Sequence, residues 1–182
     1  MSNSTLKASF VTALFAGFGL VGLAPFFDHF VPTLWYSAAM YALLLAHTFF
    51  SIRCFSHVVN PKDPTQILMD IVLVVCFLNL GFRLGSQSLG LPLAWTLLFV
   101  FASLKYALLV GWIPHPHLLR RKLVADIGGI FMGVVFYELV FYASITNIIP
   151  YELPYQIFTF FFLLASGYYF FIRPLYVPDR SV

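Results

Sequence analysis

Six long apolar segments constrain this chain more than any other feature, because each is long enough to cross a lipid bilayer. A membrane-spanning helix needs roughly 20 mostly apolar residues, and a run of about 18 is already a candidate. The segments cover residues 8–27, 33–55, 67–85, 93–112, 123–149 and 155–176. The connections between them are short and contain helix breakers. The sequence therefore predicts an all-α, polytopic membrane protein, a six-transmembrane-helix bundle, with residues 1–182 forming one transmembrane domain and no soluble domain.

The overall composition points to the same class of protein. Of 182 residues, 61% are hydrophobic and 9% are charged, whereas a soluble domain is about 25% charged. So much apolar surface could be neither buried in one small core nor left in water, which excludes a cytosolic globular enzyme and a disordered chain. The formal net charge of +3 is too small, and the basic residues are too scattered, for a nucleic-acid partner.

The basic residues near the ends of the apolar runs all fall on one side of a six-span arrangement. They are Lys7, Arg53, Lys62, Arg120, Arg121, Lys122, Arg173 and Arg180. By the positive-inside rule, we expect both chain termini in the cytoplasm. The first run lacks an A-x-A cleavage site, so we interpret it as a span and not as a signal peptide. The expected location is a bacterial inner membrane.

Two sequence patterns bear on how the helices pack. Residues 67–71 read ILMDI and residues 123–127 read LVADI, which allows an arrangement of three similar helical hairpins. Gly129 and Gly133 form a small-residue face in the fifth run. Such faces let helices approach closely, and we expect this one to pack inside the bundle in preference to forming a dimer.

Several polar and ionisable side chains fall within the apolar runs, where a charge costs roughly 2.5–3.5 kcal/mol and normally faces the protein interior with a partner. These candidates for a transport or gating role are His47, Asp70, Asn79, Arg83, Lys105, Asp126 and Glu138. Their positions along the helices divide them into two layers at different depths, because each residue advances an α-helix by about 1.5 Å.

The inner layer lies toward the basic side and contains His47, Asp70, Lys105 and Asp126. Lys105 is the natural counter-ion for Asp70 or Asp126, and a histidine can change charge near neutral pH. These inner-layer residues could also have a purely structural role. Acids near a helix N-terminus are stabilised by the helix dipole, and a long lysine side chain can reach the interface without a partner.

The outer layer contains Arg83, Glu138 and Asn79. Arg83 and Glu138 fall at matched depth in the outer third of their helices, so an ion pair between them would cancel two costly charges. Asn79 lies one helical turn before Arg83 and could extend that pair toward the centre of the membrane. The pair would serve either as an outer gate or as a purely structural clamp.

Cofactor motifs are sparse, and we expect no cofactor. The chain has no CxxC, CxxCH or HExxH sequence, so Cys54 and Cys76 are expected to be free thiols. An intramembrane b-type haem needs two facing histidines, whereas only His47 lies well inside a run. A weaker possibility is a metal held by His57, His115 and His117 at the cytoplasmic face. These imidazoles could instead lie beside anionic lipid headgroups.

The basic segment before the fifth run contains Arg120, Arg121 and Lys122. These side chains are candidates for contact with lipid headgroups, since they could grip a phosphate. The neighbouring Asp126 lacks the repeated aspartates of a two-metal phosphotransfer site. An enzyme is therefore possible but is not the default interpretation.

The leading functional hypothesis is a transporter or channel that passes a small solute or ion through the charged layers. The first alternative is a membrane-embedded enzyme for a lipid or isoprenoid substrate, suited to an aromatic interior and a basic rim. The second is a non-catalytic accessory subunit of a membrane complex. The expected partners are membrane lipids, the solute or ion, and a possible second copy or partner subunit.

Overall fold

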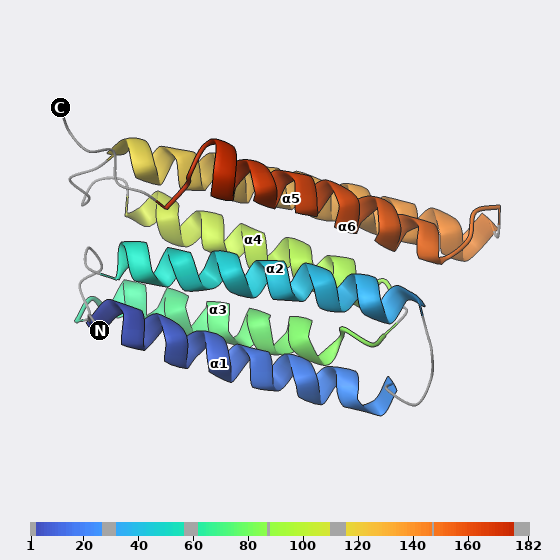
Figure 1. Cartoon of the computed structure of the whole chain (residues 1–182), viewed down its shortest axis with the longest axis horizontal. Coiled ribbons are helices and arrows are strands. Elements are labelled where there is room, and N and C mark those ends of the chain that lie inside the picture. Colours follow the sequence, from blue (N-terminus) through green and yellow to red (C-terminus); the bar gives the residue numbers. More distant parts are fainter. Residues whose placement is uncertain are drawn as a thin grey trace.

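The computed structural model describes residues 3–26, 32–56, 62–86, 88–109, 116–146 and 148–176, with backbone only at 116 and 117. The elements are α1 (Asn3–Leu23), η1 (Ala24–Phe26), α2 (Pro32–Phe55), α3 (Pro64–Phe82), α4 (Gly90–Leu108), α5 (Pro116–Thr146), α6 (Glu152–Gly167) and η2 (Tyr168–Ile172). Within these ranges there is no strand, and six helices are long and apolar enough to cross a membrane. The all-α six-helix fold is confirmed (Figure 1).

Local sequence explains where several helices begin. Proline is the first residue of α2, α3 and α5, a position where its missing N–H costs nothing and its fixed φ suits the helix. At α3, the Asp63 side chain also accepts a hydrogen bond from the Thr65 backbone N–H at 2.9 Å, which caps the helix. Because α5 begins at Pro116, Arg120 to Lys122 lie within a helix and not in the connection where the sequence had placed them.

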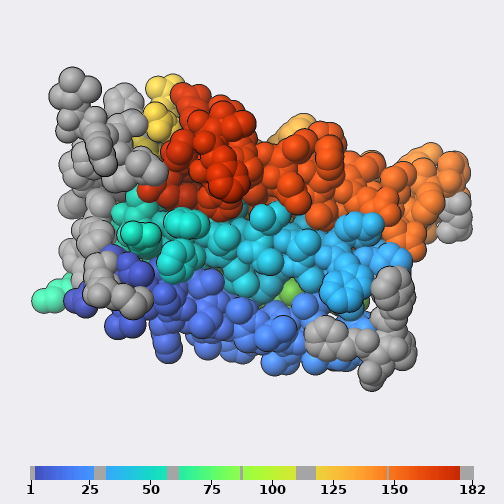
Figure 2. All heavy atoms as spheres, in the orientation of Figure 1, coloured from blue at the N-terminus to red at the C-terminus, as the bar shows by residue number. Residues whose placement is uncertain are grey.

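The helices form two layers of three. In one layer α2 packs between α1 and α6, and in the other α4 packs between α3 and α5 (Figure 1). Contacts between α1 and α3 and between α5 and α6 join the layers, so neighbouring helices close a ring. Figure 2 shows the face made by α1, α2 and α6, whose side chains cover most of the second layer.

The ends of the bundle differ in charge. Lys7 in α1, Arg53 in α2, Arg120 in α5 and Arg173 after η2 lie at one end, which we call the basic end. We call the opposite end the far end. The first helix begins and the last helical segment finishes at the basic end (Figure 1).

The far half of the bundle has a packed aromatic core. Phe136 of α5 stacks on Phe158 of α6 at 4.3 Å between ring centroids, and Trp95 of α4 meets Phe158 and Phe162 edge to face at 5.1 and 4.8 Å. Such offset and edge-to-face pairs contribute about 0.5–1.5 kcal/mol beyond the area they bury. Phe136 is only 1% exposed. The aromatic part of the main core therefore lies in the far half, and a smaller buried cluster of Phe55, Tyr106, Leu109, Leu118 and Leu119 lies at the basic end.

Glycines allow two close helix contacts. An added Cβ at Gly22 of α1 would meet the backbone of Gly81 in α3. Added Cβ atoms at Gly129 and Gly133 would meet side chains of α4, including Phe99. The small-residue face of the fifth run therefore packs inside the bundle, as expected.

The chain leaves the last span through the π-helical segment η2. The Arg173 backbone N–H donates to the Tyr168 carbonyl at 2.8 Å, and the Leu175 N–H donates to the Tyr169 carbonyl at 2.9 Å. These wide turns bring the chain back against the bundle, where Leu175 is 1% exposed.

Candidate functional site

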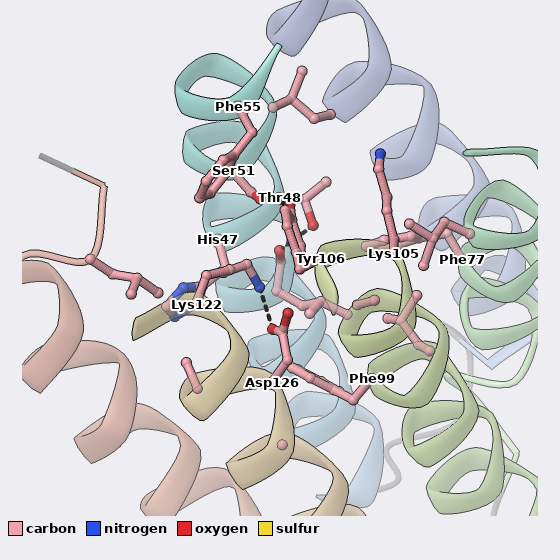
Figure 3. Close-up of a pocket in the computed structure, with 18 of the residues that line it drawn as sticks. His47, Thr48, Ser51, Phe55, Phe77, Phe99, Lys105, Tyr106, Lys122 and Asp126 are labelled. Carbon is pink, nitrogen blue, oxygen red and sulfur yellow. Dashed lines mark hydrogen bonds and ion pairs between the residues drawn. The ribbon is translucent and has the colours of Figure 1, made fainter. Parts of the chain in front are cut away.

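A cavity of about 530 Å³ occupies the basic half of the bundle. Residues of all six helices line it, from Lys7 and Ser56 near the basic end to Leu44, Phe99 and Phe162 near the middle of their helices. Most of the wall is aliphatic or aromatic, and the polar side chains form clusters within it (Figure 3). The aromatic core of the far half begins where the cavity ends.

The cavity reaches the bundle surface between α5 and α6. Phe131 of α5 lines the cavity and is 70% exposed, and the neighbouring Gly128 is also exposed and lines it. Ala165 lines it from α6 and Tyr169 from η2, which continues α6. Farther along the same pair of helices, the stacked ring of Phe136 closes the seam. We call the gap lined by Gly128, Phe131, Ala165 and Tyr169 the α5–α6 opening.

An ion pair between Lys105 Nζ of α4 and Asp70 Oδ1 of α3 lies at the cavity wall. Of the two counter-ions expected for Lys105, the structure pairs it with Asp70, whereas Asp126 pairs with Lys122. The Lys105 side chain is 13% exposed and that of Asp70 is 49% exposed. The pair therefore joins two helices near the basic end, and its carboxylate remains in reach of solvent or headgroups.

A second ion pair lies within α5, between Lys122 Nζ and Asp126 Oδ1 one turn apart (Figure 3). The two side chains are 10% and 1% exposed. The Lys122 ammonium also lies 5.0 Å from the centre of the Tyr106 ring, a cation–π contact. Lys122 thus points into the cavity, and the expectation that it contacts lipid headgroups is wrong.

His47 of α2 is held by two hydroxyl groups and an aromatic ring. Its Nδ1 lies 3.1 Å from Tyr176 Oη and its Nε2 lies 3.0 Å from Ser166 Oγ, and its ring stacks on Phe170 at 4.3 Å. Each hydroxyl can either donate to an imidazole nitrogen or accept from one, so both ring nitrogens have a hydrogen-bond partner. The predicted charge change of His47 stays a prediction.

Hydroxyl groups are the members of the site that the sequence did not reveal. Ser51 Oγ and Tyr106 Oη form a buried hydrogen bond between α2 and α4, and Ser166 and Tyr176 bond to His47. The one available signal is spacing, because Ser51 lies one helical turn after His47 and so shares its face. Serine and tyrosine are common in membrane helices, so position alone does not mark these residues as part of a site.

The outer layer does not assemble as predicted. Arg83 Nε donates to Asn79 Oδ1 at 2.8 Å, which confirms that these two share a face. However, the expected Arg83–Glu138 ion pair is not formed among the described residues, because α4 lies between α3 and α5 and both charged side chains are exposed. Neither Glu138 nor Arg83 nor Asn79 lines the cavity. The interpretation of these residues as one intramolecular gate is therefore wrong.

A second pocket, of about 520 Å³, lies at the basic end beside the start of α5 and the η2 segment, and it shares Tyr169 and Leu175 with the cavity. It is lined by Arg120, Arg121, Val124, Tyr168, Tyr169, Arg173 and Leu175. Three guanidinium groups at this surface can donate hydrogen bonds to phosphate or carboxylate oxygens. The placement of Arg120 and Arg121 fits the headgroup contact that their sequence predicts, and Arg173 joins them from the other end of the chain.

The weak metal prediction falls mostly outside the described residues. His57 and His115 are not described, and only the backbone of His117 is. Within the described ranges, no three His, Cys, Asp or Glu side chains gather in a way that could hold a metal ion. Cys54 and Cys76 are free thiols, as expected.

No family model, curated protein or solved structure matches the chain.

Proposed function

We propose that this membrane protein binds an amphipathic molecule with one long apolar chain, a lipid or an isoprenoid, in the cavity of its basic half. The observation that carries the proposal is the cavity itself, which combines a mainly apolar wall with a polar cluster and an opening on the lipid-facing surface. Its volume of about 530 Å³ falls in the range of small-molecule sites, roughly 300–1,000 Å³.

The character of the wall favours an apolar chain over a free ion. Leu44, Phe77 and Phe99 surround the deep part of the cavity, and cavities with such walls stay dry unless an apolar group fills them. An ion or small polar solute there would lose its hydration without gaining hydrogen bonds, at a cost of several kcal/mol. A hydrocarbon or isoprenoid chain has no hydration to lose when it leaves the bilayer for this space.

The polar groups of the cavity provide a place for the head of such a molecule. Lys105 and Asp70 neutralise each other, as do Lys122 and Asp126, so the head meets hydrogen-bonding groups without a large net charge. The exposed Lys7 adds one cation at the rim. A head near the basic end and a chain directed toward the middle of the bundle would match both parts of the cavity.

The α5–α6 opening gives the route of entry, because a molecule dissolved in the bilayer can slide through it without crossing water. Gly128 lacks a side chain at this point, and no atom lies within 4 Å of where its Cβ would be. With the basic end in the cytoplasm, as the positive-inside rule predicts, the ligand would come from the cytoplasmic leaflet of a bacterial inner membrane.

Binding is favoured over hydrolytic catalysis by the contacts of His47. Both of its ring nitrogens bond to hydroxyl groups, and none of the described carboxylates bonds to it. A catalytic triad needs the histidine to be oriented by an acid while it takes a proton from a nucleophile. The hydroxyl pair instead fixes the imidazole in the wall of the site.

Passage of a small solute or ion is the second candidate, and one observation favours it. His47, Asp70, Lys105 and Asp126 all line the same cavity, so the predicted inner layer lies along one space that begins near the basic end. A protein of this kind would need a second arrangement in which the aromatic core of the far half parts. Ion or solute flux into proteoliposomes, lost in Lys105→Met, would favour this candidate.

The test of the first candidate uses two glycines that tolerate a side chain. Gly128→Leu would fill the α5–α6 opening, whereas Gly17→Leu is a matched control on α1 that does not line the cavity. Both positions are exposed, and neither Cβ would meet an atom within 4 Å. Leucine also favours helix more than glycine does, so both variants should fold.

The measurement is native mass spectrometry of protein purified in mild detergent, followed by extraction and identification of bound lipids. We expect the wild type and Gly17→Leu to carry a co-purified single-chain amphiphile. We expect Gly128→Leu to retain about tenfold less, the equivalent of about 1.4 kcal/mol. Equal retention in the two variants, or no amphiphile bound to the wild type, would contradict the proposal.

A further inference from the structure

We infer that the protein forms a two-fold symmetric dimer through its α3–α4–α5 layer, in which Arg83 of each copy pairs with Glu138 of the second copy. The inference concerns the outer surface of the bundle and does not depend on what the cavity binds.

Glu138 requires an explanation because of where it lies. It is exposed on α5, among exposed apolar side chains such as Val134, Phe141 and Ile145. It lies eight residues before Thr146 at the end of the span, roughly 12 Å below that end at 1.5 Å per residue. A carboxylate facing lipid at this depth is costly, and such groups in membrane proteins normally have a partner.

Arg83 is the complementary charge at the same height. Both heights can be measured against α4. Gly133 of α5 lies against Trp95 and Thr96, and Arg83 lies against Gly90, about five residues nearer the far end. Glu138 is also five residues, roughly 8 Å, nearer the far end than Gly133. Arg83 is also exposed, and its bond to Asn79 uses Nε. Other guanidinium N–H groups remain to bind a carboxylate.

Between these two charges, α4 presents an apolar stripe. Leu93, Leu97, Val100, Leu104 and Leu108 are each between 38% and 50% exposed. Their spacing of three or four residues places them along one side of the helix, which is the pattern by which two parallel helices pack against each other. The middle of the α3–α4–α5 layer thus has a surface that fits a second α4.

Symmetry connects the stripe with the two charges. In this layer α4 lies between α3 and α5 (Figure 1). A two-fold axis perpendicular to the membrane and passing beside α4 would place α3 of one copy opposite α5 of the other, at unchanged depth. One such rotation forms both Arg83–Glu138 pairs together, as expected for a self-complementary dimer interface. The occupant that fits this face is therefore a second copy of the chain.

The test is cross-linking through a residue close to the proposed axis. Val100→Cys, in a background with Cys54→Ser and Cys76→Ala, should form a disulfide-linked dimer when oxidised in proteoliposomes at low protein density. Leu14→Cys in the same background is the control, because Leu14 is similarly exposed, at 45%, near the middle of α1 in the other layer. Cross-linking of Val100→Cys no greater than that of Leu14→Cys would overturn the inference.

The same cross-linking assay tests the Arg83–Glu138 pair. Glu138→Gln, which keeps the size of the side chain, should lower the cross-linked fraction of Val100→Cys, since it removes half of each ion pair. Exchanging the charges, as Arg83→Glu with Glu138→Arg, should restore the cross-linked fraction. Thermal unfolding of each purified variant checks that the variant folds. Folded variants in which Glu138→Gln has no effect, or in which the exchange restores nothing, would show that the pair is not part of the interface.

Discussion

The two halves of the bundle are built from the same six helices but are packed in opposite ways. In the far half, Trp95, Phe136 and Phe158 stack into a closed aromatic core. In the basic half, the helices surround a cavity in which lysines and aspartates pair. Large rings fill the space between helices in the far half, whereas Ala125 and Gly128 contribute little side-chain volume beside the cavity. The comparison indicates that the far half holds the bundle together and the basic half is available for a ligand.

The largest expected effect separates the halves by stability. Phe136→Ala should lower the free energy of unfolding by about 4 kcal/mol, because it leaves a void beside Phe158 in the packed half. Leu73→Ala should cost only about 1 kcal/mol, because its side chain is partly buried and already borders the cavity. Unfolding by SDS titration in mixed micelles measures both. Equal losses would remove the distinction between a packed half and a hollow half.

A second, smaller effect tests how much the Lys122–Asp126 ion pair stabilises the basic half. Asp126→Leu should cost about 3 kcal/mol, because it leaves the Lys122 ammonium buried without its partner. Lys122→Met combined with Asp126→Leu should recover most of that loss, since neither charge then remains. The same micelle titration compares the single and double variants. If the single variant is as stable as the double, Lys122 reaches the interface on its own and the pair does not order the cavity.

The smallest effect concerns the more exposed pair. Asp70→Asn should cost about 1 kcal/mol or less, because the Asp70 side chain is 49% exposed and its attraction to Lys105 is weakened by solvent. The difference from the wild type should shrink further at high salt, which screens charges at an accessible site. Thermal unfolding at low and high salt provides the measurement. A loss as large as that of Asp126→Leu would mean that both pairs are equally enclosed.

Depth along each helix could be read from the sequence, and this explains which predictions were confirmed. The length of the apolar runs predicted the six spans, and the depth of Lys105 limited its counter-ion to Asp70 or Asp126, of which the structure shows Asp70. Counting residues gives depth because every residue advances a helix by the same distance. The same counting placed Arg83 and Glu138 at one height, which the structure supports.

Direction around each helix could not be read in the same way. In a soluble helix the apolar stripe marks the buried side, but here lipid-facing and bundle-facing sides are both apolar. The sequence therefore could not tell that α4 separates Glu138 from Arg83, or that Lys122 points into the bundle. The contacts of His47 with Ser166 and Tyr176 join residues more than one hundred positions apart, and only the ring order of the helices brings them together.

The position of Tyr176 in the site depends on the exact number of residues in the π-helical segment Tyr168–Ile172. Its wide turns let Tyr176 return to His47 while Leu175 seals the wall beside it. Shortening this segment by one residue would swing the following residues by about 100°, carrying the Tyr176 hydroxyl away from the imidazole. Such a chain would keep six spans and an almost unchanged hydropathy profile, yet Leu175 and Tyr176 would no longer line its cavity.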